Sequence, residues 1–98
     1  MATFVLMTKL SPSISAQMKD RAEIGRAWLD RVHEKCPGVK FLAHYAVLGP
    51  YDFLDIYEAP DEETAAKVSM ISLAHGAERA ESWLAMPYKR LLELAREI

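Results

Sequence analysis

A very short link between two β-rich segments constrains the fold of this chain more than any other feature. Residues 40–48 (KFLAHYAVL) and residues 51–58 (YDFLDIYE) are separated only by Gly49-Pro50, a pair typical of turns. Two strands joined by so short a turn form an antiparallel hairpin. Because one helical pattern precedes this hairpin and another follows it, the hairpin is expected at the centre of a mixed α and β domain.

Each of the two helical segments beside the hairpin has a recognisable start and end. Asp20 and Glu23 have the spacing of a capping box, and Pro37-Gly38 ends the first segment. Asp61 is a favourable N-cap for the second helix, and Gly76 is its predicted C-terminal stop. Apolar or small residues recur at helical spacing along the first helix and form one stripe: Gly25, Trp28, Leu29, Val32 and Cys36.

The outer segments add two further strands and a last helix. Residues 3–10 are apolar on both alternating faces, which is typical of a strand that is covered on both sides. Residues 78–86 predict a fourth strand, and a final helix is expected between Pro87 and Ile98. The order β-α-β-β-α-β-α predicts one α+β domain over residues 1–98, a ferredoxin-like βαββαβ(α) sandwich with a four-stranded antiparallel sheet and helices on one face.

Alternation along the third strand separates its side chains into two sets. Leu54 and Ile56 share one face, and we expect the helices to pack against it. The other face would then be open and would carry Phe53, Asp55, Tyr57, Trp83 and either His44 or Tyr45. Soluble monomers seldom expose so many aromatic rings together. We therefore expect sheet-to-sheet packing into a homodimer or a larger even-numbered oligomer, with a pocket between two copies.

Charge and composition exclude several classes of protein. The chain has 12 basic and 14 acidic residues, a formal charge of -2, so it lacks the basic excess typical of nucleic-acid binding or of binding to an anionic membrane. Its single cysteine, Cys36, excludes an internal disulfide. The first residues do not have the pattern of a signal peptide, and no apolar run approaches the roughly 20 residues of a membrane span. These features predict a soluble, cytoplasmic protein.

Several short motifs resemble those of one known family. Gly49-Pro50-Tyr51-Asp52 precedes the third strand, EAPDEETA follows that strand, and Arg79-Ala80-Glu81-Ser82 lies in the fourth. With these motifs the chain resembles the GYD family over nearly its whole length. The resemblance implies the dimeric α/β-barrel architecture. Relatives of that architecture include small monooxygenases, haem-handling enzymes, stress-responsive proteins and ligand-sensing domains, so the fold alone does not select a function.

Asp55 and Tyr57 are the strongest candidates for chemistry. They lie two apart on one strand, so a carboxylate and a phenol can address the same pocket, where burial would raise the pKa of the carboxyl and suit it to acid–base work. His44 would join them if it shares their face. The alternative is structural, with Asp55 paired to Arg79, to a backbone donor or to the partner subunit.

Metal and haem sites are not predicted. His33 and Cys36 share one face of the first helix, but His75 is the only further soft ligand, so a zinc site would lack ligands. Haem needs an axial ligand such as one histidine, which the three histidines permit without predicting. We expect neither a metal nor a cofactor.

The sequence favours a homo-oligomeric protein that binds a small hydrophobic or aromatic molecule or acts as an accessory subunit. Its predicted ligand-binding residues are Phe53, Asp55, Tyr57, Trp83 and His44. One alternative is a small cofactor-free enzyme, monooxygenase-like or isomerase-like, that transfers protons through Asp55, Tyr57 and His44. Another is an oligomer scaffold with a solid core and no pocket.

Overall fold

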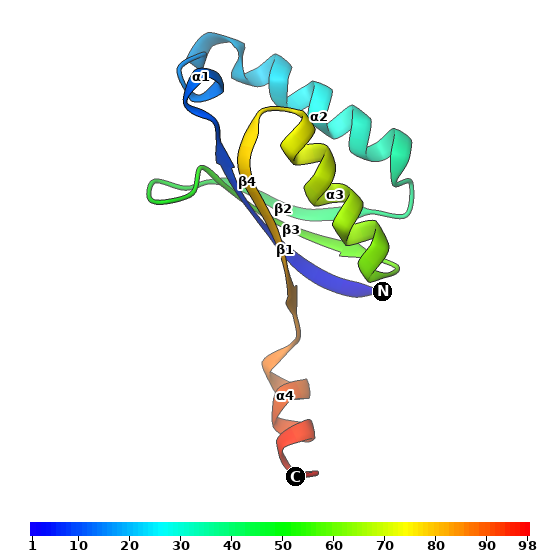
Figure 1. Cartoon of the computed structure of the whole chain (residues 1–98). Helices are drawn as coiled ribbons and strands as arrows, with labels where there is room; N and C mark the ends of the chain where they lie inside the picture. The colour runs from blue at the N-terminus through cyan, green and yellow to red at the C-terminus, as the bar shows by residue number, and fades with distance from the viewer.

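Four antiparallel strands form one sheet, and two long helices cover one of its faces (Figure 1). The structure is a computed structural model that describes residues 1–98. Its elements are β1 (Ala2–Leu10), α1 (Pro12–Ser15), the 3-10 turn η1 (Met18–Asp20), α2 (Arg21–Lys35), β2 (Lys40–Ala46), β3 (Phe53–Ala59), α3 (Glu62–Ala74), β4 (Ala77–Ala85) and α4 (Tyr88–Ala95). The strand order β2-β3-β1-β4 confirms the predicted ferredoxin-like arrangement.

The ends of the helices follow local chemistry, with one exception. Asp61 caps α3, because its Oδ1 accepts a hydrogen bond of 2.8 Å from the backbone N–H of Thr64. Gly76 follows α3 with φ at 99°, a left-handed conformation that favours glycine. Asp20 precedes α2, but its side chain makes no capping hydrogen bond. The predicted capping box at Asp20 was therefore wrong, because the η1 turn rather than an extended residue leads into α2.

Asp52 ties the hairpin loop to the neighbouring strand β1. Its Oδ2 accepts a hydrogen bond of 2.8 Å from the backbone N–H of Leu10, and its own N–H donates to the carbonyl oxygen of Thr8 at 2.8 Å. The carbonyl oxygen of Asp52 also accepts from the N–H of Val47 at 2.9 Å, across the hairpin. Asp52 therefore has the structural role expected for it, and it fixes the end of β1 as well as the turn.

Strand register determines which side chains lie beneath the helices. Phe4 is paired with Tyr57 and Leu6 with Asp55, so these four side chains share one face of the sheet. The rings of Phe4 and Tyr57 are stacked with centroids 5.5 Å apart. The core forms around them with side chains from α2, α3 and the segments beside them: Val32, Cys36, Val39, Ala65 and Val68.

The predicted assignment of the two sheet faces was wrong. Asp55 and Tyr57 lie on the face that the helices cover, whereas Leu54 and Ile56 lie on the uncovered face. The reason is the size of the helix side chains. α3 offers mainly small residues to the core, such as Ala65 and Val68, so large rings from the sheet fill the space beneath it.

The uncovered face, termed the open face, is apolar and aromatic. It carries Val5, Tyr45, Leu54, Ile56 and Trp83, which the strand register places together. Trp83 is 47% exposed, and its ring packs edge-on against Tyr51 at a centroid distance of 6.4 Å. Glu81 accepts hydrogen bonds from the Tyr51 hydroxyl (2.8 Å) and from the Trp83 indole (2.9 Å). Of the two predicted alternatives, Tyr45 is on this face and His44 is not.

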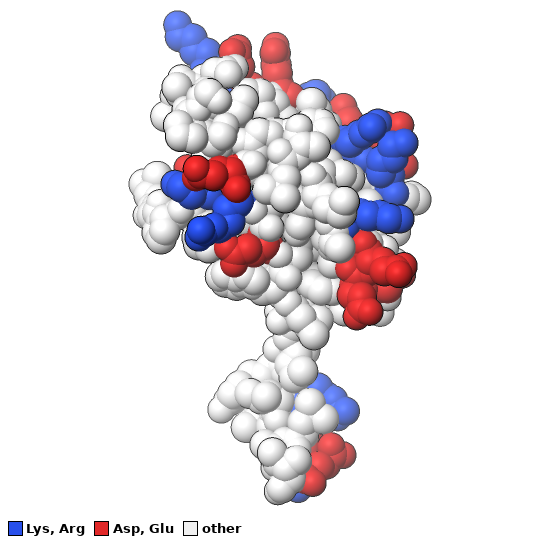
Figure 2. All heavy atoms as spheres, viewed as in Figure 1, with Lys and Arg blue, Asp and Glu red and all other residues white.

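The last helix, α4, projects away from the rest of the molecule beyond the end of β4 (Figure 1). In Figure 2 its charged side chains lie along one side, and the rest of its visible surface is uncharged. Leu91 and Leu92 on this helix are both exposed. None of the helices combines the length with the apolar character needed to cross a membrane.

Candidate functional site

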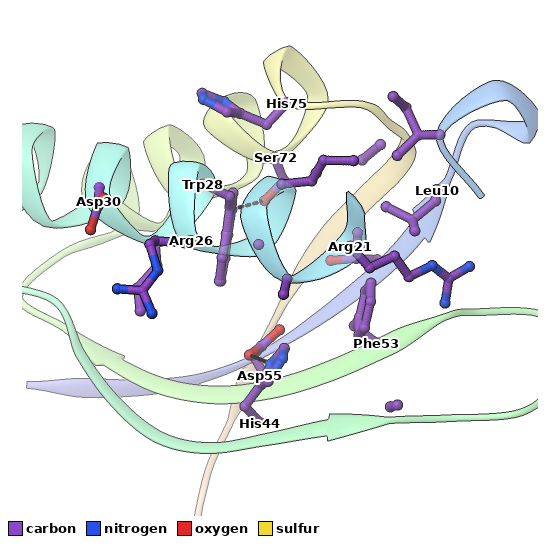
Figure 3. A pocket seen from close by; sticks show the side chains of 18 of the residues that line it. Leu10, Arg21, Arg26, Trp28, Asp30, His44, Phe53, Asp55, Ser72 and His75 are labelled. Carbon is purple, nitrogen blue, oxygen red and sulfur yellow. Dashed lines mark hydrogen bonds and ion pairs between the residues drawn. The ribbon is translucent and has the colours of Figure 1, made fainter. Parts of the chain in front are cut away.

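A cavity of about 710 Å³ lies between α2 and the sheet and is termed the α2 cavity (Figure 3). Its apolar and aromatic lining includes Leu10, Ile14, Ile24, Trp28, Phe41 and Phe53. Its charged lining consists of two arginines, Arg21 and Arg26, and two aspartates, Asp30 and Asp55, besides His44 and His75. The cavity belongs to one chain and lies beneath a helix, on the side of the sheet opposite the open face.

The cavity exists because the first turns of α2, before Trp28, do not pack into the core. Val32, near the C-terminal end of α2, is fully buried in the core. About two helical turns earlier on the same stripe lies Gly25, which lines the cavity and has no side chain to fill it. A Cβ atom added at Gly25 would meet nothing within 4 Å. The N-terminal half of α2 therefore covers the sheet without packing on it.

Asp55 is the polar centre of the cavity. It is only 2% exposed, and its Oδ1 is hydrogen-bonded to Nδ1 of His44, which lies opposite it on β2. Burial raises the pKa of the Asp55 carboxyl, and the hydrogen bond to His44 opposes part of that rise. The second oxygen, Oδ2, has no hydrogen-bond partner and is not enclosed by protein. Figure 3 shows the Asp55 side chain pointing from the sheet toward α2.

Aromatic rings surround the His44–Asp55 pair. The His44 ring stacks on Phe53 with centroids 5.5 Å apart and planes inclined by 20°. Trp28 of α2 lies at a centroid distance of 6.5 Å from the same ring, with planes inclined by 27°. The Trp28 indole N–H donates to the Ser72 hydroxyl at 2.9 Å, which fixes the ring and ties α2 to α3. These contacts give the cavity a rigid aromatic side.

Arg21 closes the end of the cavity near α1. Its Nη2 donates to the carbonyl and hydroxyl oxygens of Ser15, each at 3.2 Å. Its Nε is enclosed by protein and has no hydrogen-bond partner. The guanidinium thus adds a positive charge to one end of the cavity, while Asp55 supplies a carboxyl group on the sheet (Figure 3).

The structure brings together three of the five predicted ligand-binding residues. Phe53, Asp55 and His44 all line the cavity. Tyr57 shares their face of the sheet, but it is fully buried outside the cavity, and its hydroxyl is hydrogen-bonded to that of Ser82 at 2.7 Å. Trp83 lies on the open face. The hypothetical His–Asp–Tyr cluster is therefore reduced to the His44–Asp55 pair.

The sequence interpretation missed the part of the site that α2 contributes. Trp28 was assigned to the helix stripe as a core residue, and Gly25 to the same stripe, but neither was connected with a pocket. A glycine in the middle of an otherwise apolar stripe was the available signal, because it leaves space where a core side chain is expected. The proposed partner Arg79 lies elsewhere, beside Glu81 at 3.8 Å.

The remaining histidines and the cysteine have separate surroundings. Cys36 is buried in the core, and burial raises the pKa of its thiol. His33 lies edge-on to Phe41 with ring centroids 6.3 Å apart. His75 lines the α2 cavity, with its Nδ1 3.0 Å from the carbonyl oxygen of Ile71. No group of three or more His, Cys, Asp or Glu side chains is arranged to hold a metal ion.

Sequence comparison identifies one family and one informative relative. The GYD domain matches residues 4–95. A protein of Thermus thermophilus described as "Glutamine synthetase and cystathionine beta-lyase binding protein" is 29% identical over 92 residues, which cover 94% of this chain and 96% of that protein.

Two crystal structures share the fold. FFRP-DM1 aligns with a TM-score of 0.57 at 17% identity, over 88% of this chain and 100% of its own. TTHA0845 from Thermus thermophilus aligns with a TM-score of 0.57 at 24% identity, over 89% of this chain and 95% of its own. At these identities the structural likeness concerns the fold alone.

Proposed function

The chain belongs to the GYD domain family, and we propose that it is a homo-oligomeric, non-catalytic accessory protein that binds a small, largely apolar molecule in the α2 cavity. One observation carries this proposal: a carboxyl group that is 2% exposed keeps a free oxygen toward an aromatic cavity. Because Oδ2 has no protein partner and opens onto the cavity, it can accept a hydrogen bond from a molecule bound there. A ligand in the cavity would satisfy Oδ2 of Asp55.

The size and lining of the cavity support a small molecule as the ligand. Its volume of about 710 Å³ falls within the range of roughly 300 to 1,000 Å³ that is usual for ligand pockets. Most of its lining is apolar or aromatic, with a few converging polar groups, which is also usual. The proposed pocket is thus within one chain, and it replaces the pocket between two sheets that the sequence suggested.

A binding role is preferred to catalysis because only two of the three predicted proton-transfer residues meet in the cavity. His44 and Asp55 form an acid–base pair, but Tyr57 is hydrogen-bonded outside it. The pair nevertheless supports a second candidate, a cofactor-free enzyme in which His44 and Asp55 move a proton on a bound substrate. Turnover of a bound compound that Asp55→Asn abolishes, with assembly retained, would favour this second candidate.

The accessory role is supported by the description of the Thermus relative, which names two enzymes as its binding partners. We infer that this chain also binds an enzyme, through surface that its own fold leaves uncovered. The uncovered apolar surfaces are the open face around Trp83 and the apolar side of α4, and the one that self-association leaves free is the surface we infer for the enzyme. Size-exclusion chromatography with purified glutamine synthetase and with cystathionine β-lyase of the same organism tests this inference, and co-elution is the expected result.

Native mass spectrometry of the untagged protein from its own cells tests the small-molecule proposal. We expect an even-numbered assembly that carries one reproducible extra mass per subunit. The variant Gly25→Leu fills the cavity from α2, so it should keep the assembly and lose the extra mass, whereas the matched variant Gly25→Ala should keep both. An assembly without extra mass, or an extra mass unaffected by Gly25→Leu, would contradict the proposal and favour a scaffold.

A further inference from the structure

The geometry of the α2 cavity points to a ligand class, and this inference rests on the proposed function. We propose that the cavity binds neutral, planar aromatic alcohols, whose hydroxyl donates a hydrogen bond to Oδ2 of Asp55. Three properties of the cavity lead to this class: the free oxygen on Asp55, the balance of charge around it, and the aromatic rings beside it.

The free oxygen can accept a hydrogen bond from a ligand that carries a donor. An ionised carboxylate has only acceptor sites, and His44 occupies Oδ1. No protein group donates to Oδ2, although it lies on a side chain that is 3% exposed. Inside a cavity of low polarity, a donor to a carboxylate contributes more than it would in water. A ligand hydroxyl meets this need.

The balance of charge disfavours an ionised ligand. The positive groups of Arg21 and Arg26 oppose the negative groups of Asp30 and Asp55, so the lining attracts neither a cation nor an anion strongly. An anion would in addition be repelled by Asp55 at the very place where the donor is needed. A neutral alcohol supplies the donor without carrying a charge into the cavity.

The surroundings of Asp55 favour a planar ring. His44 and Phe53 form a nearly parallel pair on the sheet, with planes inclined by 20°. On the helix side, Ala22 and Gly25 have small side chains or none, and open space lies at Gly25. Aromatic rings on the sheet side and small residues on the helix side leave room for an aromatic ring, which packs favourably against other rings.

Isothermal titration calorimetry with four related probes tests the ligand class on the full-length wild-type protein. The probes are 1-naphthol, 1-methoxynaphthalene, 1-naphthoate and 1-naphthylmethylammonium, which differ only in the group on a common ring system. We expect 1-naphthol to bind about tenfold more tightly than 1-methoxynaphthalene, which cannot donate, because a hydrogen bond to a charged acceptor contributes roughly 1.4 kcal/mol or more. Both charged probes should bind more weakly than 1-naphthol.

Four variants test whether the probes bind in the α2 cavity and whether 1-naphthol donates its hydrogen bond to Asp55. Asp55→Leu should remove the preference for 1-naphthol, and Asp55→Asn, which keeps one acceptor and the volume of the side chain, should reduce it. Gly25→Leu should abolish binding of every probe. Trp83→Phe changes the opposite face of the sheet and should change no affinity. Circular dichroism confirms that each variant is folded before it is titrated.

The outcomes separate this inference from the proposed function. If 1-naphthol and 1-methoxynaphthalene bind equally and Gly25→Leu abolishes both, the cavity binds ligands but the aromatic-alcohol class is wrong. If a charged probe binds best, the class is also wrong. If no probe binds the wild type, or if Gly25→Leu leaves the affinities unchanged, the proposed function and the ligand class both fail.

Discussion

Asp55 shows how a carboxyl group can lie in a buried strand. Its neighbours Leu54 and Ile56 face the other side of the sheet, so the group is enclosed by the helix side alone. There one oxygen is satisfied by His44, and the other faces the α2 cavity. A carboxyl group held in this way costs stability when it is ionised. That cost can be measured through its dependence on pH.

The stability of the protein should therefore fall as Asp55 ionises. Burial raises the pKa of Asp55 in the folded state above its value in the unfolded chain. The folded state then binds the proton more tightly, so the stabilisation is present below the unfolded pKa of about 3.9 and is lost as pH rises through the folded pKa. Denaturant unfolding of wild type and Asp55→Asn at a series of pH values should show this loss in the wild type only.

His44 is hydrogen-bonded to Asp55, so the comparison needs a control for this partner. The control repeats both unfolding series in proteins that also carry His44→Gln and therefore have no imidazole beside residue 55. The pH-dependent difference in the free energy of unfolding, with and without Asp55→Asn, should remain. If the difference in the free energy of unfolding did not depend on pH in these proteins, burial would not raise the pKa of Asp55.

Tyr57 should contribute to stability and not to ligand binding. Its ring stacks on Phe4, and its hydroxyl is hydrogen-bonded to Ser82. Tyr57→Phe keeps the ring and removes the hydrogen bond, so we expect the free energy of unfolding to fall by about 0.5–1.5 kcal/mol. Calorimetric affinity for 1-naphthol should be unchanged. Loss of 1-naphthol binding in a folded Tyr57→Phe variant would mean that Tyr57 takes part in ligand binding.

At the scale of single elements, α2 decides whether the site exists. Trp28 ties it to α3 through Ser72, and Val32 packs its C-terminal end into the core. Between these anchors and Arg21 the helix spans open space at Gly25. A glycine within a helix interior also lowers helix stability relative to alanine. Gly25 therefore combines a cost in stability with the space that a ligand needs.

Two glycines beside the same cavity should respond oppositely to alanine. At Gly25 an added Cβ meets nothing within 4 Å, so Gly25→Ala should stabilise the protein by up to about 1 kcal/mol through helix propensity. At Gly76 the backbone has φ at +99°, and a Cβ would lie 2.7 Å from Cγ1 of Ile14, so Gly76→Ala should destabilise it by more than about 1 kcal/mol. Thermal unfolding of both variants measures the two effects. If Gly25→Ala destabilised the protein as much as Gly76→Ala, the added Cβ at Gly25 would meet other atoms, and α2 would lie closer to the sheet.

The helices and strands could be predicted from the sequence, but the face of the sheet that the helices cover could not. The Asp61 cap marks the start of α3, and the Gly49-Pro50 turn lies in the loop that joins the two strands of the hairpin, which is longer than predicted because β2 ends at Ala46 and β3 begins at Phe53. Alternation along β3 correctly grouped Asp55 with Tyr57, yet it contains no information on which side the helices lie. That choice depends on the volumes of side chains from α3 and β1, such as Val68 and Phe4, which meet only after folding. The cavity was missed for the same reason.

At the scale of the whole molecule, two apolar surfaces remain without a partner in a single chain. One is the open face, where Tyr45 and Trp83 are exposed, and the other is α4, where Leu91 and Leu92 are exposed. Exposed apolar patches of this kind are typical of interaction sites. We infer that another copy of the chain covers the open face.

A charge on the open face should therefore dissociate the oligomer. Trp83→Glu introduces a carboxylate beside Glu81 on this face, on the edge strand β4. Removing a buried aromatic anchor typically costs about 2 kcal/mol or more, so self-association should weaken by at least about thirtyfold in sedimentation equilibrium. Ala27→Glu, on the exposed outer side of α2, is the matched control and should leave the association unchanged. Association that survives Trp83→Glu would place the interface elsewhere.

Amide hydrogen exchange of α4 then tests whether this helix belongs to the same interface. An isolated helix of 8 residues is not stable in water, because helices shorter than about 12–15 residues are marginal without tertiary packing. If α4 docks on the partner copy, its amides should exchange at least about tenfold more slowly in the wild-type oligomer than in dissociated Trp83→Glu. The amides of α3, which pack within one chain, should exchange alike in both proteins and serve as the internal control. Fast exchange of α4 in both would mean that self-association does not cover it, and Leu91 and Leu92 would then be free for a different protein, such as the enzyme partner proposed above.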